Sequence, residues 1–429
     1  MLVHFSVKNY KSLRENQSID FELTSKSVAQ EGFGLTREYS KFPVSPVAGV
    51  FGANASGKTN LIEAMSFFAH IVSDGSVSGY EDKVRFSTYM FDKHSKESPI
   101  EFFSVFGVDK NIYEYTLILN KERVLFEKLS IVINSKGENN KFFDIFKREF
   151  LGGGYQWNWG IGTPTKYEIP KMHRKLADNL DDKRLFFSFY SLSFDNEELK
   201  ELSRLILSLK MVPLKEDGGK DDIPLARKNF LLRELKYKSF RKAVTGFLSL
   251  FEPSIVDIKS VNEEIMVVLK VNDNEYDMPL YLESQGIRQM FRLSAIILNT
   301  FRRGTVLVID ELDAHLHHLI SKKIIMMFQD SELNKNGAQL VFTSHDLNLL
   351  DNLIFCREQI YLAEKNKSAV TSITSLIEIE DIRQRDPFLK KYLSGRMLGL
   401  PVLKSDKLFR EDVQDSLSVF EYHVIERIS

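Results

Sequence analysis

The sequence predicts an α/β protein with a mixed, mainly parallel core sheet, a second antiparallel sheet and a helical insertion. Apolar runs at Val47–Phe51, Val306–Ile309 and Gln339–Ser344 each end in glycine or polar residues, as buried strands of a parallel sheet do. Three β-rich runs at residues 100–134 are separated by turn residues, which indicates an antiparallel sheet. Helical periodicity in the middle of the chain predicts the insertion.

The elements divide the 429 residues into three expected parts. Residues 1–140 form an N-terminal lobe, with strand-like runs near the start and a helix at residues 59–72. Residues 141–252 form the helical insertion, with helices at residues 196–210 and 225–251 on either side of a polar break at 215–222. Residues 253–429 form a C-terminal lobe, where strand and helix alternate from 255 to 344 as in a parallel α/β core.

The composition excludes several classes of protein. Hydrophobic residues make up 43% of the chain, enough for a large core, and 58 Lys and Arg balance 59 Asp and Glu. The charge therefore creates no global attraction to nucleic acid or anionic lipid. The lone Cys356 excludes an intramolecular disulfide and fits a reducing compartment. The N-terminus lacks the apolar core of a signal peptide, and no apolar run approaches the roughly 20 residues of a membrane span, so a cytoplasmic location is expected.

A phosphate-binding loop follows the apolar strand at Val47–Phe51 and opens the next helix. The segment from Gly52 to Thr59 reads Gly-Ala-Asn-Ala-Ser-Gly-Lys-Thr and satisfies the phosphate-loop pattern in the context that the pattern requires. Backbone N–H groups and the helix N-terminus supply positive charge, Lys58 reaches the terminal phosphates, and Thr59 ligates magnesium. The expected nucleotide contacts here are Gly52, Asn54, Ala55, Ser56, Gly57, Lys58, Thr59 and Asn60.

Two acids end the second apolar strand. Asp310 and Glu311 follow Val306–Ile309, and carboxylates at the end of a buried strand need a cation or a proton. With a phosphate loop upstream, Asp310 is predicted to hold the magnesium shell and Glu311 to act as the catalytic base that polarises the attacking water. ATP and Mg²⁺ are therefore the expected substrate and cofactor.

A histidine ends the third strand. His345 follows Gln339–Ser344, where it is placed to contact the γ-phosphate and report its loss. A lone histidine is more often a capping or packing residue. Its order after Asp310-Glu311 favours the catalytic interpretation, so Lys58, Glu311 and His345 form the predicted catalytic set.

The order of these motifs resembles a known family. Phosphate loop, Glu283-Ser-Gln-Gly-Ile-Arg288, VLVIDELD and TSHD resemble the ABC-type ATPase head of the chromosome-maintenance and recombination branch. Within that branch, the sequence resembles the compact bacterial ATPases grouped with the overcoming-lysogenization-defect proteins and the RloA-like, abortive-infection ATPases of phage defence. Asn9-Tyr-Lys-Ser-Leu13 and, near the other end, Tyr392-Leu-Ser-Gly-Arg396 with Gly399-Leu-Pro401 resemble further motifs of that group.

The resemblance implies a site shared between two subunits. Ser284 and Gly286 match the serine and glycine that reach the γ-phosphate of the opposite subunit, which implies a homodimer or larger assembly with ATP at its interface. Asp313 matches the loop that communicates between the two sites, and His317 matches a histidine common after it. The match is imperfect, because His318 replaces the usual proline and Gln285 and Ile287 depart from the serine–glycine element.

One expected residue is missing. The family carries a glutamine that helps to ligate magnesium, yet residues 60–155 contain none. Asp92 and His94 have suitable chemistry, but an ordinary loop role is favoured for both.

Two functions of different classes remain open at this stage. The first is an ATP-switched sensor or scaffold for a separate effector, such as a co-encoded nuclease, in anti-phage defence. About 84 residues follow His345 and hold no acidic D-x-D cluster, so the nuclease would be another chain. The alternative is a recombination or repair ATPase that clamps DNA. Contact with DNA or RNA would come from a basic stretch comprising Arg227, Lys228, Arg233, Lys236, Lys238, Arg241 and Lys242, although a solvated face is the favoured interpretation.

Overall fold

A six-stranded sheet lies at the centre of the chain and carries the predicted motifs. The computed structural model describes residues 1–24, 32–35, 43–77, 86–133, 141–160, 162–193, 196–212, 225–314 and 316–399. The strand order is β16-β15-β3-β14-β13-β9, with β3 at Val47–Phe51, β9 at Met211–Val212, β13 at Val306–Ile309, β14 at Gln339–Ser344, β15 at Ile360–Lys365 and β16 at Thr371–Ser375. All neighbours are parallel except the β15–β16 pair.

Both faces of this central sheet are covered, which explains its unbroken apolar strands. In β3, Ala48 and Val50 belong to one core, and Val47 and Phe51 belong to another. The first core joins the central sheet to α2 (Lys58–Asp74), α5 (Phe186–Ser193) and α6 (Glu197–Leu207). The second joins it to α9 (Gln285–Arg303) and α10 (His318–Gln329). Because the sheet is buried on both sides, its strands need no polar face.

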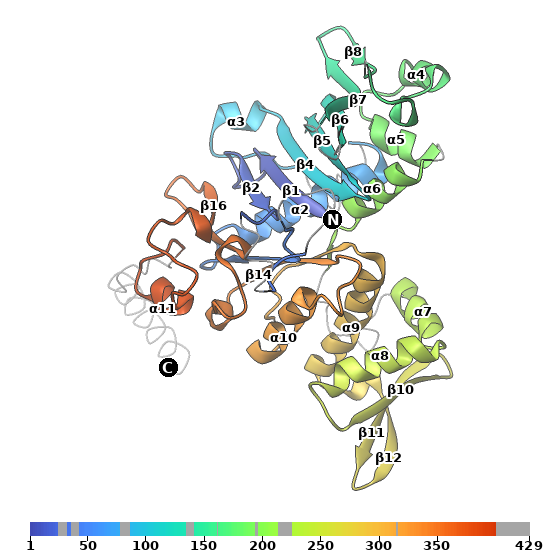
Figure 1. Cartoon of the computed structure of the whole chain (residues 1–429), viewed down its shortest axis with the longest axis vertical. Helices are drawn as coiled ribbons and strands as arrows, with labels where there is room; N and C mark the ends of the chain where they lie inside the picture. Colours follow the sequence, from blue (N-terminus) through green and yellow to red (C-terminus); the bar gives the residue numbers. More distant parts are fainter. Residues whose placement is uncertain are drawn as a thin grey trace, which may run out of the picture.

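A seven-stranded antiparallel sheet lies against the first core, in the upper half of Figure 1. Its order is β2-β1-β4-β5-β6-β7-β8, with β1 at Leu2–Lys8, β2 at Gln17–Asp20, β4 at Ile100–Val108, β5 at Asn111–Leu119, β6 at Val124–Ile133, β7 at Lys141–Phe150 and β8 at Tyr155–Asn158. Burial alternates strictly along β5, so one face packs on the core. The predicted fold class, α/β with a mainly parallel core sheet beside an antiparallel one, is confirmed.

The predicted helical insertion starts with strands. β7 and β8 extend the antiparallel sheet, because β7 pairs with β6 over most of its length. Helices begin only at α4 (Lys171–Ala177) and continue with α5 and α6. The expected helix at residues 225–251 is two helices, α7 (Leu225–Glu234) and α8 (Lys238–Ser249). The polar break at 215–222 lies outside the described residues, and the domain boundaries at 140 and 252 stay predictions.

A three-stranded antiparallel sheet corrects the expectation for residues 255–279. We expected these strands to join the parallel core; instead β10 (Ile255–Val261), β11 (Glu264–Val271) and β12 (Asn274–Pro279) pair only with one another among the described strands. Two-residue turns explain this, because Asn262-Glu263 and Asn272-Asp273 all have positive φ, between 49° and 64°. Such turns join adjacent antiparallel strands. With α7 and α8 this sheet forms the arm at the lower right of Figure 1.

The remaining described helices are short. α3 covers Lys93–Glu97 and α11 covers Phe388–Leu393, with single 3₁₀ turns at Thr165–Tyr167, Leu280–Leu282, Leu347–Leu349, Arg357–Gln359 and Leu376–Glu378. Among the described residues, none of the helices is long and apolar enough to cross a membrane.

Candidate nucleotide-binding site

The phosphate loop connects β3 to α2 and needs glycine at two positions. Gly52 and Gly57 have φ values of 150° and 99°, and Ala55 also has a positive φ of 61°. A Cβ atom on Gly52 would lie 2.4 Å from the Ala363 carbonyl oxygen, and one on Gly57 would lie 2.1 Å from the Thr371 hydroxyl. The loop is therefore shaped by the neighbouring β15–β16 hairpin as well as by its own sequence.

Lys58 folds back over this loop. Its Nζ donates to the carbonyl oxygens of Gly52 (2.8 Å) and Ala53 (2.9 Å) and lies 3.3 Å from Nδ1 of His345. Only 4% of the residue is exposed. Burial lowers the pKa of Lys58 to about 8, against the opposing attraction of Asp310, Asp313 and Glu311. An anion beside this ammonium group would restore a full positive charge.

Thr59 and Asp310, the two predicted magnesium ligands, meet at the start of α2. The Thr59 hydroxyl lies 3.2 and 3.1 Å from the two carboxylate oxygens of Asp310. Thr343, at the end of β14, donates to the same carboxylate at 2.5 Å. A hydroxyl beside a carboxylate offers the hard oxygen ligands that Mg²⁺ prefers, and phosphates and water commonly complete its octahedral shell. No group of three or more His, Cys, Asp or Glu that could hold a metal by itself occurs in the described residues.

Glu311 and His345 face each other across the site. Glu311 Oε1 lies 3.8 Å from His345 Nε2, and the Glu311 backbone has an unusual φ of 53°. The Glu311 N–H donates to the Thr343 hydroxyl at 2.7 Å, which fixes this conformation. Burial, and then the charge of Lys58, lower the pKa of His345 below its ordinary value, so the imidazole is neutral near pH 7.

Asp313 contacts the backbone of His345. Its two carboxylate oxygens accept the His345 backbone N–H at 3.3 Å each. Asp313 therefore connects the loop after β13 to the end of β14 and positions His345. It does not line the cavity described next.

Seven of the eight predicted phosphate-loop contacts, together with Glu311 and His345, line one cavity of about 400 Å³, a size typical of small-ligand sites; Gly52 does not line it. Its lining consists of Asn54, Ala55, Ser56, Gly57, Lys58, Thr59, Asn60, Glu311, His345 and Lys365. The structure thus brings together elements that lie almost 300 residues apart. Lys365, at the end of β15, was not predicted; the parallel pairing of β15 with β3 is what places it here, and no local motif identifies it.

The N-terminal motif supports the phosphate loop from outside. Ser12 accepts a hydrogen bond from the Asn60 side chain (2.5 Å), and its hydroxyl lies 2.7 Å from that of Thr371. Thr371 in turn donates to the Ser56 carbonyl at 2.8 Å. These contacts give a structural role to the Asn9–Leu13 motif that the family resemblance singled out.

The C-terminal motif reaches the loop as well. The Ala53 N–H donates to the Gly399 carbonyl oxygen at 3.2 Å, and the Tyr392 hydroxyl donates to the same oxygen at 2.5 Å. Leu400 and Pro401, the rest of the predicted motif, lie outside the described residues.

Ser284 and Gly286 do not line the cavity of their own chain. Ser284 is exposed and caps α9, where its hydroxyl accepts the Ile287 N–H at 3.3 Å. From the next turn of α9, Gln289 donates to the Ala314 carbonyl oxygen at 2.8 Å, which ties the helix to the loop after Glu311. The predicted contact of Ser284 and Gly286 with a second subunit's ATP stays a prediction.

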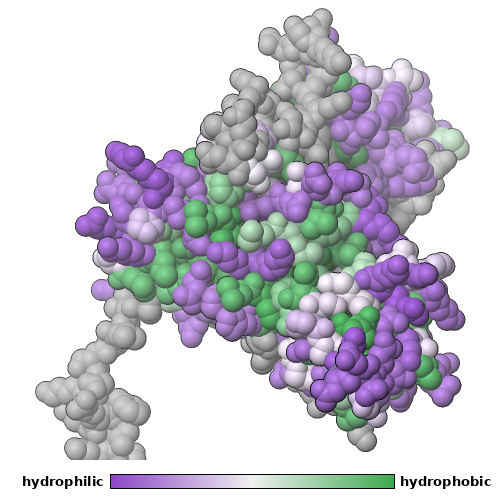
Figure 2. Space-filling model, turned by 60° about the horizontal axis from the view of Figure 1, so that its bottom comes forward, coloured by the Kyte–Doolittle hydropathy of each residue, from purple (hydrophilic) through white to green (hydrophobic). Residues whose placement is uncertain are grey.

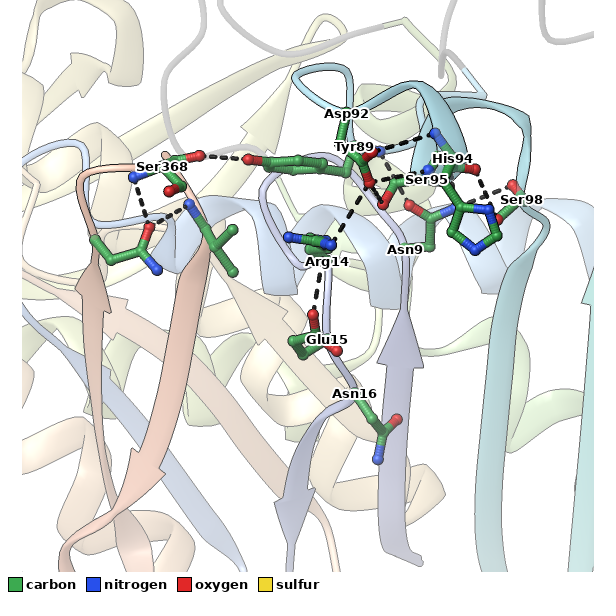
Figure 3. A network of polar contacts seen from close by, with 12 residues as sticks. Asn9, Arg14, Glu15, Asn16, Tyr89, Asp92, His94, Ser95, Ser98 and Ser368 are labelled. Carbon is green, nitrogen blue, oxygen red and sulfur yellow. Dashed lines mark hydrogen bonds and ion pairs between the residues drawn. The ribbon is translucent and has the colours of Figure 1, made fainter.

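Asp92 and His94 have structural partners, in agreement with the ordinary loop role favoured for them (Figure 3). Asp92 caps α3 and accepts from the Ser95 hydroxyl (2.5 Å), the Ser95 N–H (3.1 Å) and the His94 N–H (3.2 Å). The hydrogen bond from the Ser95 side chain is the main reason why the pKa of Asp92 is lowered. Arg14, from the N-terminal segment, lies 3.6 Å away.

Comparison with known proteins identifies the family. Among solved structures, the chain matches the SMC head domain from Thermotoga maritima with 15% identity and a TM-score of 0.39, over 87% of this chain and 98% of that one. A search of curated proteins finds no match. Residues 47–351 match the family described as "AAA domain, putative AbiEii toxin, Type IV TA system". The matched range covers about seven-tenths of the chain and contains the phosphate loop, Asp310, Glu311 and His345. This chain therefore belongs to that family of AAA domains.

Proposed function

We propose that the chain binds ATP with Mg²⁺ in the phosphate-loop cavity and hydrolyses it. The observation that carries this proposal is the convergence of Lys58, Glu311 and His345 on one cavity, next to the Thr59–Asp310 pair. This set supplies a phosphate-binding cation, oxygen ligands for a metal and a base beside it. A glycine-rich turn that merely packed would not need these groups together.

Each residue has a role in the proposed reaction. Lys58 exchanges its contacts with the loop carbonyls for contacts with the terminal phosphates. Thr59 and Asp310 would hold Mg²⁺, which supplies positive charge against the phosphate oxygens when it is bound. Glu311 orients and polarises the attacking water, and neutral His345 is placed to donate or accept a hydrogen bond at the γ-phosphate.

We propose further that two copies complete each other's sites. Ser284 and Gly286 of one copy would contact the γ-phosphate in the other, as the resemblance implies. Two exposed apolar side chains lie near matched family residues: Leu282, beside the predicted contact residue Ser284, is 62% exposed, and Leu319, beside His317, is 60% exposed. Apolar residues also gather in a band across the middle of the face in Figure 2. Such exposure is common where a partner docks, which supports a dimer.

The cellular role that we propose is an ATP-controlled switch or scaffold for a separate effector, such as a nuclease, in anti-phage defence. The family description names a toxin of a toxin–antitoxin system, which agrees with a defence role. The DNA-clamp alternative gains less support, because Arg241 of the basic stretch is paired with Asp257 at 3.2 Å and Arg233 lies over the Phe230 ring.

The test is phosphate release from ATP by the purified chain at increasing protein concentration, with Mg²⁺ and with excess EDTA. We expect activity per chain to rise with concentration, because a second copy is needed, and to disappear with EDTA. A chain that neither binds nor hydrolyses ATP under any of these conditions would overturn the proposal.

A further inference from the structure

A second cavity, of about 440 Å³, shares no lining residue with the cavity at the phosphate loop and has a basic lining. It is formed by Ser191, Lys200, Ser203, Arg204, Leu207, Ser208, Asn299, Arg303 and Thr305. These residues come from α5, α6, the end of α9 and the turn before β13. The lining holds three cationic side chains, four hydroxyl groups and one amide, and no carboxylate.

Two arginine groups of this cavity are available to a ligand, whereas the Ser191 and Ser208 hydroxyls already donate to backbone carbonyl oxygens. Within the described part of the chain, the Arg303 side chain makes no hydrogen bond or ion pair. Ser203 and Thr305 are each only 8% exposed, yet both line the cavity. The Nε atom of Arg204 is buried and has no hydrogen-bond partner among the described residues. A buried donor without a partner costs free energy, which an anionic acceptor in the cavity would recover.

The carboxylates that pair with two of these cations lie outside the lining. Lys200 contacts Glu197 at 3.0 Å and Arg204 contacts Glu201 at 2.5 Å, each three residues earlier on α6. Lys200 is 44% exposed and Glu197 is 85% exposed. Exposed pairs of this kind contribute little to stability. An incoming anion can therefore take over these contacts at small cost.

The cavity lies at one end of α9 and of β13. The residues for which we propose roles in ATP hydrolysis lie at the other end of each element. Arg303 ends α9, the helix that begins beside Ser284, and Thr305 precedes β13, the strand that ends at Asp310 and Glu311. The Ser208 hydroxyl accepts the Val306 N–H at 3.0 Å, and Arg204 donates to the Arg303 carbonyl oxygen at 2.9 Å. A ligand held here would contact α6 together with the junction of α9 and β13.

We propose that this cavity binds a small phosphate-bearing molecule of about nucleotide size. Guanidinium groups and hydroxyls are the donors that recognise phosphoryl oxygens, and the volume is in the range of small-molecule sites. The binding site does not depend on the proposed ATPase activity. It uses none of the residues around the phosphate loop.

Binding of pyrophosphate and of AMP, measured by calorimetry, tests this site. All chains carry Lys58→Ala, which silences the phosphate loop so that only the second cavity is counted. We expect the reference chain to bind one ligand, and a chain that also carries Arg303→Ala to bind roughly tenfold or more weakly, because a charge-assisted contact is lost. Arg303 is exposed at a helix end, so the variant should melt at an unchanged temperature without ligand.

Arg302→Ala is the matched control. Arg302 is the neighbouring charge on α9, is 58% exposed and lies outside the lining of this cavity. Its removal should change affinity by no more than roughly twofold, as expected for a screened surface charge. Failure of the reference chain to bind either probe, or equal losses in Arg302→Ala and Arg303→Ala, would overturn the proposal. Tighter binding of single-stranded DNA, with displacement of pyrophosphate, would also overturn it and identify a nucleic-acid groove instead.

Discussion

Glu311 and Lys58 lie in the same cavity, but we propose separate tasks for them. Lys58 contacts the loop that would hold the phosphates, whereas Glu311 lies beside His345 at the end of β13. Glu311→Gln should therefore retain ATP and lose hydrolysis by about a hundredfold or more, because only the base is removed. Lys58→Ala should lose both, with ATP affinity lower by roughly a hundredfold.

Calorimetry for ATP affinity and phosphate release for hydrolysis distinguish the two variants. Equal loss of ATP binding in both would remove Glu311 from its assignment as the base.

The lowered pKa of Lys58 predicts a pH dependence of ATP affinity. Below its pKa of about 8 the free protein already carries the charged ammonium group, so ATP binding requires no proton. Above pH 8 the free lysine is increasingly neutral, and each binding event must take up a proton from solution. Affinity should therefore fall by up to about tenfold per pH unit above pH 8, the slope expected for uptake of one proton.

Calorimetry at pH 7, 8 and 9, in buffers of different ionisation enthalpy, measures this proton uptake. Lys58→Arg is the control, since arginine stays charged over this range and should bind ATP without the uptake. An affinity that is flat from pH 7 to pH 9 in the original chain would contradict the role given to Lys58.

Among the elements, the phosphate loop depends most on its neighbours. Gly57→Ala would place a methyl group 2.1 Å from the Thr371 hydroxyl, at a φ of 99° that alanine rarely adopts. We expect a loss of about 1–3 kcal/mol in the free energy of unfolding, together with loss of ATP binding. Chemical denaturation and calorimetry measure the two effects.

Gly246→Ala in α8 is the matched control for this prediction. A Cβ atom there meets nothing within 4 Å, and alanine favours a helix over glycine by up to about 1 kcal/mol. This variant should be as stable as the original chain or more so, with unchanged ATP binding. A similar loss of unfolding free energy in both variants would contradict the prediction that a Cβ atom is tolerated at Gly246 but not at Gly57.

Some of these elements could be predicted from local sequence patterns, and others could not. The apolar strands β3, β13 and β14 and the loop after β3 were predicted correctly, because a strand buried on both faces and a phosphate loop both have strong local patterns. The prediction that the strands of the three-stranded sheet belong to the parallel core was wrong. It relied on the alternation of strands and helices and did not use the turn residues Asn262 and Asn272. Strands β7 and β8 were missed because the helical periodicity that follows them was extended too far back.

At the scale of the whole molecule, contacts between distant segments complete the site. Lys365, Thr371 and Gly399 touch or support the phosphate loop only because β15 pairs with β3 and the C-terminal segment passes Ala53. No sequence motif near Lys365 predicts that this residue lies beside the phosphate loop. The part of the site carried by consecutive motifs was therefore predictable, and the part supplied by sheet order was not.

We propose that the site spans two molecules: one chain carries the phosphate loop, and a second copy completes the site. Ser284 is exposed and outside the cavity of its own chain, so Ser284→Arg should leave ATP binding intact. It should abolish hydrolysis, because a bulky cation would block closure of the two copies. The Lys58→Ala chain, by contrast, has an intact Ser284 and a defective loop.

Phosphate release by a mixture of these two inactive chains, after subunit exchange, tests the claim most directly. Our account predicts that the mixture regains activity, because a mixed dimer joins the intact loop of one copy to the intact Ser284 of the other. Both chains measured alone at the same total concentration serve as controls. Full activity of Ser284→Arg alone, or an inactive mixture that demonstrably contains mixed dimers, would contradict the account.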